Sequence, residues 1–271
     1  MASDRFALDG RVALVTGGAG ILGRRFCSGL AEHGAAVAIV DIDAEGAKRL
    51  ADEISRETGG RTLPVACDLR EPEQVRRMAD DVVSAFGRID VLHNNAAGKS
   101  SDLDAFFAPF EDYSLKQWRA VMAIDLDAMF LVAQAVGKHM VARGGGGSVI
   151  QTASIYGVVA ADQRIYAGSE YGGRPINTPA VYAAAKAGVI GLTRHLAAYW
   201  APHRIRVNAL TPGGVESGQN ETFRRRYSDR VPMGRMANPD EMVGALVYLA
   251  SDASSYVTGQ NIIVDGGLTA W

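Results

Sequence analysis

The sequence at residues 12–23 reads VALVTGGAGILG, an apolar run that passes directly into a glycine-rich turn. Helical spacing follows over residues 24–33, so the stretch predicts a buried strand, a tight turn and a helix. Glycines let the backbone approach a phosphate closely, and a helix N-terminus offers free N–H groups and a partial positive charge. The stretch therefore predicts a phosphate-binding turn, with an ordinary strand–helix turn as the alternative.

Further short apolar runs recur along the chain, separated by segments with helical spacing such as residues 46–58 and 72–86. Continuous apolar runs predict strands buried on both faces, and helices between them predict a parallel sheet covered on both sides. The predicted fold class is α/β, a doubly wound sheet with ligands beyond the carboxyl ends of its strands. The predicted strands are Val12–Thr16, Ala36–Val40, Thr62–Ala66, Ile89–Leu92, Ser148–Thr152, Arg206–Leu210 and Asn261–Val264.

The composition fits one α/β domain over residues 1–271, because no internal repeat or linker divides the chain. Lysine plus arginine is 28 and aspartate plus glutamate is 30, a net charge of −2, which argues against a nucleic-acid binder. The cysteines, Cys27 and Cys67, are too few for a disulfide framework and fit a reducing compartment.

No targeting, membrane or metal-binding segment is expected from the sequence. Residues 1–10 lack the charged-then-apolar order of a secretory signal, and no stretch approaches the ~20 apolar residues of a membrane-spanning helix. The five histidines are scattered, and no Cys/His cluster has metal-ligand spacing. We therefore expect a cytoplasmic protein without a metal or a membrane partner.

The second predicted strand ends in Val40-Asp41, about 20 residues beyond the glycine-rich turn. An acidic residue there can accept both ribose hydroxyls of a dinucleotide and repels a 2′-phosphate. Asp41 therefore favours NAD over NADP, with a solvated turn carboxylate as the alternative. Arg24 and Arg25 could meet a phosphate, but we expect them to face solvent.

Tyr182 and Lys186 lie four residues apart in a helical pattern, so they share one face. A free phenol has a pKa of about 10, too high for a base at neutral pH. A lysine ammonium roughly 4 Å away contributes about 4 kcal/mol at an effective dielectric of about 20, enough to bring that pKa near neutrality. Tyr182 is thus a candidate acid–base residue, and the Ser154 hydroxyl can hold and polarise a substrate oxygen. The alternatives are a surface pair and a strand-end cap.

The order of motifs resembles a single-domain short-chain dehydrogenase/reductase over nearly the whole chain. The resemblance implies a seven-stranded parallel Rossmann sheet, a homotetramer, and hydride transfer between NAD(P) and an alcohol–carbonyl pair. Each motif alone is weak, but their joint order is specific. The motifs are Thr16–Gly23, Cys67-Asp68-Leu69, Asn94-Asn95-Ala96, Ser154, Tyr182-Ala183-Ala184-Ala185-Lys186, Arg206-Val207-Asn208, Pro212-Gly213 and Asp265-Gly266-Gly267.

By position, the resemblance implies a catalytic set and a cofactor-binding set. Adenine would contact Asp68 and Leu69, the adenosine ribose Asn95 and Ala96, and the nicotinamide carboxamide Val215 and Ser217. A strand-end cap at Asn95 and a helix cap at Asp68 are the alternatives. The catalytic set is Ser154, Tyr182, Lys186 and Asp125. The cofactor-binding set is Gly17, Gly20, Ile21, Leu22, Gly23, Asp41, Asp68, Leu69, Asn95, Ala96, Tyr182, Lys186, Pro212, Gly213, Val215 and Ser217.

The chain departs from the family pattern at three places. Glycine stands at Gly20 where the family has it at the position of Ile21, and the loop after the fourth strand places its glycine one residue late, at Gly98. Both departures indicate altered backbone at the cofactor cradle. The third is Asp125, in place of a family asparagine that holds a water in a proton relay. An ionised aspartate accepts hydrogen bonds but cannot donate one, so a structural role is the alternative.

Two segments are expected to border the substrate pocket: an insertion around residues 158–178 and a lid around 213–232. Their polar side chains, arginines among them, favour a polyhydroxylated ligand or a carboxylate, with a solvated excursion or an oligomer contact as the alternative. The predicted function is NAD-dependent oxidation of a secondary alcohol of a sugar, sugar acid or polyol. The alternatives are an NADP-dependent 3-oxoacyl-type carbonyl reductase and a non-catalytic dinucleotide-binding protein.

Overall fold

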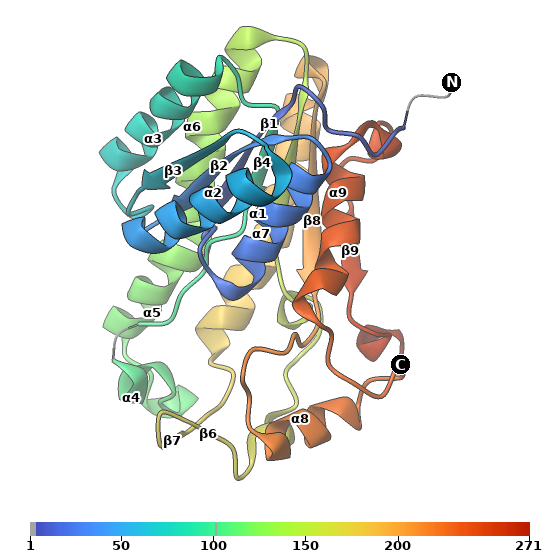
Figure 1. The fold of residues 1–271 in the computed structure, drawn as a ribbon. Helices are drawn as coiled ribbons and strands as arrows, with labels where there is room; N and C mark the ends of the chain where they lie inside the picture. The colour runs from blue at the N-terminus through green and yellow to red at the C-terminus, as the bar shows by residue number, and fades with distance from the viewer. Residues whose placement is uncertain (1–3, 101) are drawn as a thin grey trace.

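The computed structural model describes residues 4–100 and 102–271, and one sheet organises them (Figure 1). Its strands are all parallel and run in the order β3-β2-β1-β4-β5-β8-β9. The predicted seven-stranded Rossmann-like sheet is therefore confirmed. The strands are β1 (Val12–Thr16), β2 (Ala36–Asp41), β3 (Thr62–Ala66), β4 (Val91–Asn94), β5 (Gly147–Thr152), β8 (Ile205–Pro212) and β9 (Asn261–Val264).

The prediction of the fourth strand is wrong by two residues, since β4 begins at Val91 and not at Ile89. Its ladder with β1 opens where Val91 pairs with Ala13. The preceding Asp90 instead holds the turn, because its carboxylate accepts hydrogen bonds from the Val12 N–H, Arg88 and Arg143.

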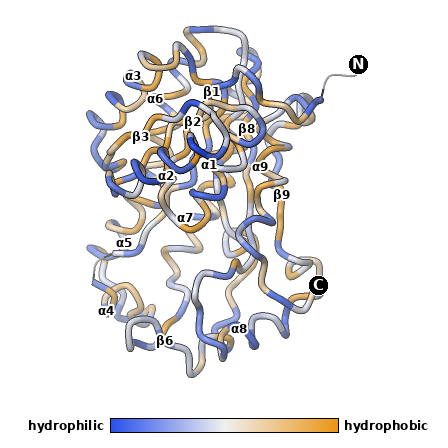
Figure 2. Tube along the Cα trace, in the orientation of Figure 1, coloured by the Kyte–Doolittle hydropathy of each residue, from blue (hydrophilic) through white to orange (hydrophobic). Residues whose placement is uncertain are grey.

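Helices cover both faces of the sheet, and successive strand residues face opposite layers (Figure 1). Val12 and Leu14 of β1 join an apolar cluster with α3, α6 and α7, whereas Ala13 and Val15 join one with α1, α2 and α9. Figure 2 shows the hydrophobic residues gathered along these strands. The helices are α1 (Ile21–Glu32), α2 (Ala44–Thr58), α3 (Pro72–Phe86), α4 (Leu103–Phe106), α5 (Leu115–Met122), α6 (Ala128–Arg143), α7 (Ala180–Trp200), α8 (Glu221–Ser228) and α9 (Val243–Ala250).

The sequence explains the ends of α2. The Asp43 side chain accepts from the Gly46 N–H at the N-terminus, so the helix starts two residues before the predicted one. Gly59 then ends it with φ of 69°, the left-handed conformation that glycine adopts without strain. The cap at Asp43 leaves the loop from β2 into α2 short, and Asp41 stays at the edge of the sheet.

One continuous helical segment spans residues 115–143, with a π-helical turn at Ala123–Asp127 between α5 and α6. By length and composition alone it could cross a membrane, although the sequence analysis did not single it out. That test is also passed by core helices, and 44% of the apolar window is buried inside the structure. Val132, Val136 and Met140 lie in the core cluster with α3 and the sheet, as core-helix residues do.

The insertion and the lid meet at the end of the molecule where α8, β6 and β7 lie (Figure 1). The insertion forms a small antiparallel pair, β6 (Glu170–Tyr171) and β7 (Arg174–Pro175). Ile165 of the insertion packs with Phe223 and Tyr227 of α8 in an apolar cluster of their own. Residues 1–3 and 101 of the predicted domain lie outside the described residues.

The contact between α6 and α7 leaves no room at Gly137. An added Cβ there would lie 2.3 Å from the ring of the buried Trp200. We predict that Gly137→Ala lowers the free energy of unfolding by about 1–3 kcal/mol through overpacking, measured by urea denaturation. The control is Gly244→Ala, an exposed glycine of α9 with nothing within 4 Å. Equal stability of the two variants would contradict this packing.

Candidate active site

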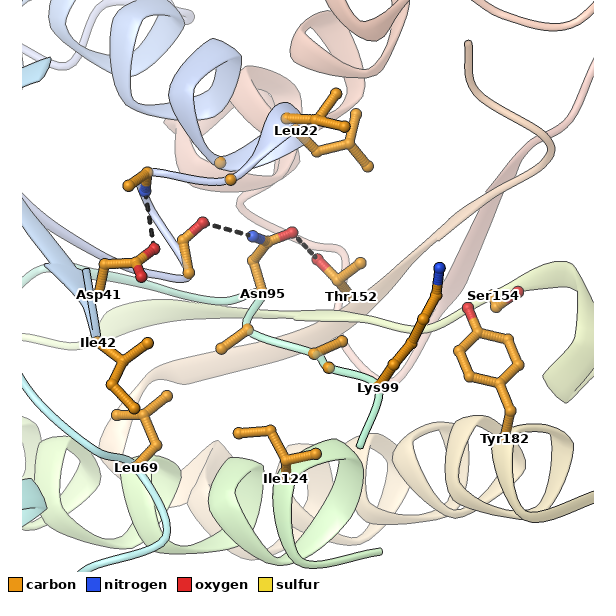
Figure 3. Close-up of a pocket in the computed structure, with 18 of the residues that line it drawn as sticks. Leu22, Asp41, Ile42, Leu69, Asn95, Lys99, Ile124, Thr152, Ser154 and Tyr182 are labelled. Atoms are coloured by element: carbon orange, nitrogen blue, oxygen red, sulfur yellow. Dashed lines mark hydrogen bonds between the residues drawn. The ribbon is translucent and has the colours of Figure 1, made fainter. Parts of the chain in front are cut away.

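A cleft of about 1080 Å³ lies at the carboxyl edge of the sheet, where β1 separates β2 from β4 and the strand order reverses. This is where doubly wound sheets bind ligands. Most of the predicted site residues line it, and Figure 3 shows several of them pointing into one pocket. The predicted residues in the lining are Gly17, Gly20, Ile21, Leu22, Gly23, Asp41, Asp68, Leu69, Asn95, Ala96, Ser154, Tyr182, Lys186, Pro212, Gly213 and Val215.

The glycine-rich turn forms one wall of the cleft. Gly17 has φ of 64°, and a Cβ on Gly23 would lie 1.9 Å from the Gly17 carbonyl oxygen, so neither position admits a side chain. The first turn of α1 carries no acidic residue, and its N-cap makes no side-chain hydrogen bond. The turn thus fits the phosphates of a dinucleotide. Gly20 has φ of −70°, which any residue adopts, so the early glycine is not required for the turn.

Asp41 is fixed at the end of β2. Its Oδ2 accepts from the Ala19 N–H at 2.9 Å and its Oδ1 from the Asp43 N–H at 3.0 Å (Figure 3). The carboxylate is half-buried and lines the cleft beside the glycine-rich turn. It therefore presents a held negative charge where the ribose of a dinucleotide is expected.

At the adenine position, Asp68 has a partner that the sequence analysis missed. Arg70 forms two side-chain hydrogen bonds with the Asp68 carboxylate and also lines the cleft. The hydrogen bond with Arg70 lowers the pKa of Asp68 from its ordinary value. Asp68 is not the N-cap of α3, since that position belongs to Glu71.

Hydrogen bonds tie together the ends of β1, β4 and β5. The Asn95 amide donates to the Thr16 carbonyl oxygen at 3.1 Å. Thr152 Oγ1 donates to Asn95 Oδ1 at 3.3 Å (Figure 3). Thr152 was not predicted, although it ends the run that leads to Ser154. His93 is a buried residue of β4. It bonds Thr152 at 2.9 Å, and burial lowers the pKa of His93 to about 3.

Ser154, Tyr182 and Lys186 converge on the opposite wall. Lys186 is 1% exposed, and its Nζ donates to the Thr152 carbonyl oxygen at 3.1 Å. The same Nζ lies 5.8 Å from the centre of the Tyr182 ring, so the four-residue spacing does bring the two together. Ser154 is buried just beyond the end of β5, and its hydroxyl lowers the pKa of the neighbouring Tyr182 phenol.

The structure does not give Tyr182 the pKa near neutrality that the sequence predicts. Burial raises the pKa of Tyr182 to about 12, and the Asp125 charge adds to the rise. The nearby Lys186 ammonium does not bring this pKa down to neutrality, and burial lowers the pKa of Lys186 itself. The simple estimate from two charges in a uniform dielectric neglected the burial of both groups.

Asp125 lies in the π-helical turn, fully buried, and does not line the cleft. Its Oδ1 accepts from the Gly98 N–H at 2.9 Å, while Oδ2 has no hydrogen-bond partner within the described part of the chain. Burial raises the pKa of Asp125, and Lys186 counters that rise. Two departures from the family pattern, the late Gly98 and Asp125, are thus joined by one hydrogen bond. The geometry fits a residue that positions the loop after β4.

The two segments expected at the substrate pocket lie differently from the prediction. No residue of 158–178 lines the cleft, and beyond Gly213 only Val215 of the lid does. Ser217 is exposed outside the cleft, with its N–H donated to Gln219. Four arginines of these segments form ion pairs, Arg164 and Arg230 with Asp162, Arg174 with Asp104 and Arg224 with Glu216.

Several cleft residues that were not predicted from the sequence lie in the loop after β4. Lys99 and Ser100 follow Gly98 into the lining, and Ile124 lies across from them (Figure 3). The position of this loop makes them predictable, because loops at the point where the strand order reverses are expected to contact the ligand.

Known proteins of similar sequence span the whole chain. The family model described as enoyl-(acyl carrier protein) reductase matches residues 18–269. D-threitol dehydrogenase of Mycolicibacterium smegmatis is 39% identical over 97% of this chain and 95% of its own. The 2-dehydro-3-deoxy-D-gluconate 5-dehydrogenase of Escherichia coli is 36% identical over 98% of each. The 3-oxoacyl-[acyl-carrier-protein] reductase of Thermotoga maritima is 35% identical over 96% and 98%.

Solved structures agree with these matches. A short-chain type dehydrogenase/reductase from Mycobacterium marinum superposes with a TM-score of 0.88 at 34% identity over 99% of both chains. A gluconate 5-dehydrogenase from Burkholderia cenocepacia, in complex with NADP and tartrate, gives 0.86 at 38% identity over 100% of both. An NAD⁺-bound xylitol dehydrogenase gives 0.83 at 31% identity over 96% and 99%. The neighbours therefore include complexes of both nicotinamide cofactors.

Proposed function

The chain belongs to the short-chain dehydrogenase/reductase family of oxidoreductases that act on CH–OH groups, and from this premise we propose that it oxidises a secondary alcohol of a sugar, sugar acid or polyol with NAD. The observation that carries the proposal is the convergence of Ser154, Tyr182 and Lys186 on one wall of a cleft whose far end holds Asp41. The named activities of the relatives support the substrate class.

The cleft residues fit a nicotinamide dinucleotide. Its pyrophosphate would lie on the turn at 17–23 and the N-terminus of α1, and its adenosine ribose would bind Asp41. Adenine would pack between Asp68 and Leu69, while Asn95 and Ala96 would line the ribose side. Pro212, Gly213 and Val215 would border the nicotinamide, with Ser217 beyond them, as the family resemblance implies. When bound, the oxidised dinucleotide accepts a hydride from the substrate carbon and adds positive charge to the site.

In the proposed reaction, the Ser154 hydroxyl holds the substrate oxygen and Tyr182 Oη takes the proton from the substrate hydroxyl. The substrate alcohol becomes a carbonyl as it loses this proton and the hydride. Lys186 stabilises the phenolate through its charge and binds the cofactor ribose. Asp125 takes the role of a positioning residue, because it holds the Gly98 backbone and lies behind the cleft.

The proposal includes one domain over residues 1–271, a cytoplasmic location and a homotetramer. These features rest on the composition and on the family resemblance.

A 3-oxoacyl-type reductase that uses NADP is the second candidate. The Thermotoga maritima reductase and the description of the matching family model favour it. The fixed Asp41 carboxylate argues against it, because a 2′-phosphate placed beside that charge would be repelled. A cofactor comparison separates the two candidates.

Tyr182→Phe should lower kcat for alcohol oxidation by at least about 1000-fold, because the proton acceptor is lost. The dissociation constant of NADH, followed by fluorescence, should stay within about threefold, since the remaining cofactor contacts persist. The control is Tyr199→Phe, an exposed tyrosine on the same helix that should retain activity. Full turnover in Tyr182→Phe would refute the assignment.

The wild-type enzyme should prefer NAD over NADP in kcat/KM by at least about 100-fold. Asp41→Ser should reduce this ratio by about tenfold or more, because the repulsion of the 2′-phosphate is removed. Asp43→Ser removes a neighbouring carboxylate but keeps an N-cap for α2, and it should leave the ratio near that of wild type. A wild-type preference for NADP would overturn the role of Asp41.

The pH dependence of alcohol oxidation tests the electrostatic link from Asp125 to Tyr182. The Asp125 charge raises the pKa of Tyr182, so its removal in Asp125→Asn should lower that pKa. A base with a lower pKa is deprotonated at lower pH, and the acid limb of the kcat/KM profile should move to lower pH. The amide oxygen of asparagine can still accept from Gly98. An acid limb that stays in place or moves up would contradict the link.

A further inference from the structure

The cleft carries a cation whose role the proposed mechanism leaves unassigned. Lys99 follows Gly98 in the loop after β4 and lines the cleft with Ser100, Ser154 and Tyr182. Figure 3 shows its side chain pointing into the pocket that also receives the Tyr182 ring. Lys99 is exposed to the cleft, whereas Lys186 is buried against the Thr152 carbonyl oxygen. Lys99 therefore presents the ammonium that a ligand beside Tyr182 can reach.

Among residues 4–100 and 102–271, no carboxylate forms a salt bridge with Lys99. The other charged groups of the lining belong to the opposite end or are already bonded. Asp41 and Asp43 lie beyond the glycine-rich turn, and Arg70 is bound to Asp68. Arg164, Arg174 and Arg224 of the insertion and lid are paired with carboxylates, and no arginine of these two segments lines the cleft. The end of the cleft near Tyr182 is thus positive and lacks an internal counter-charge.

The insertion holds this ammonium in place. The Lys99 Nζ lies 4.0 Å from the centre of the Tyr171 ring in β6, a cation–π contact. On the other side of Lys99, the Gly98 N–H is fixed by the buried Asp125. A lysine held by a ring on one side and a tethered backbone on the other is ordered for binding, and it loses less entropy than a free surface lysine.

We propose that Lys99 binds a carboxylate of the substrate, so that the enzyme acts on sugar acids in preference to neutral sugars and polyols. This inference rests on the proposed function, because the same molecule must present its reacting hydroxyl to Ser154 and Tyr182. The carboxylate accepts charge-assisted hydrogen bonds from the ammonium, which orients the chain of hydroxyl-bearing carbons along the cleft. The insertion contributes to recognition through Tyr171, without lining the cleft itself.

The test uses matched pairs that differ in one group, threitol with threonate and glucitol with gluconate. In each pair a terminal CH₂OH is replaced by a carboxylate. We expect the wild-type ratio of kcat/KM, acid over polyol, to exceed about 10, the weaker end of an ionic hydrogen bond. In Lys99→Met this ratio should fall roughly 10- to 100-fold, mainly through the KM of the acid. Lys99→Arg should recover most of it.

The matched control is Lys116→Met, which removes an exposed lysine of α5 outside the cleft and should keep the wild-type ratio. A wild-type ratio near one, or a ratio that Lys99→Met does not change, overturns the proposal while alcohol oxidation itself stands.

If no member of the series is oxidised, the proposed function fails, and calorimetric binding of tartrate to the enzyme with NADH decides the site. Binding that weakens about tenfold or more in Lys99→Met supports it, and equal or no binding overturns it.

Discussion

A buried ammonium constrains the site more than any other group. Lys186 is almost fully enclosed, and a charge removed from water is costly unless hydrogen bonds and an opposite charge compensate it. The Thr152 carbonyl oxygen supplies the hydrogen bond and Asp125 the opposite charge. These partners come from β5 and from the π-helical turn, so one side chain fixes the end of the sheet, a helix irregularity and α7 together. That arrangement positions Tyr182, which lies on α7, and Ser154, which follows β5.

The cleft is electrostatically divided along its length. Asp41, held by two backbone N–H groups, marks the end that selects the cofactor. Lys99, held by Tyr171 and by the tethered Gly98, marks the end that we propose selects the substrate. In this proposal the insertion affects substrate binding only through the contact of Tyr171 with Lys99. Its own arginines are paired with nearby carboxylates. Specificity in this fold can thus arise from a loop residue that an insertion orients.

The sequence predicted the sheet well, because its strands are short apolar runs rich in β-branched residues that alternate with longer helical patterns. It placed β4 two residues early, since Ile89 is apolar but Asp90 is committed to the turn. Residue types at the strand ends located Asp41 and Ser154, the four-residue helical spacing located Tyr182 and Lys186, and all four line one cleft. The pKa of Tyr182, the pairing of the insertion arginines and the exposure of Ser217 depend on burial and on contacts distant in sequence, which spacing does not encode.

We infer that the buried Lys186 charge, which Asp125 compensates, serves the reaction and adds nothing to stability. The most direct test is the double variant Lys186→Met/Asp125→Asn, which removes both charges at similar volume, measured for unfolding free energy and for alcohol oxidation. The double variant should be at least as stable as wild type, with kcat reduced by about 1000-fold or more. A double variant that is clearly less stable yet still oxidises alcohols would contradict it.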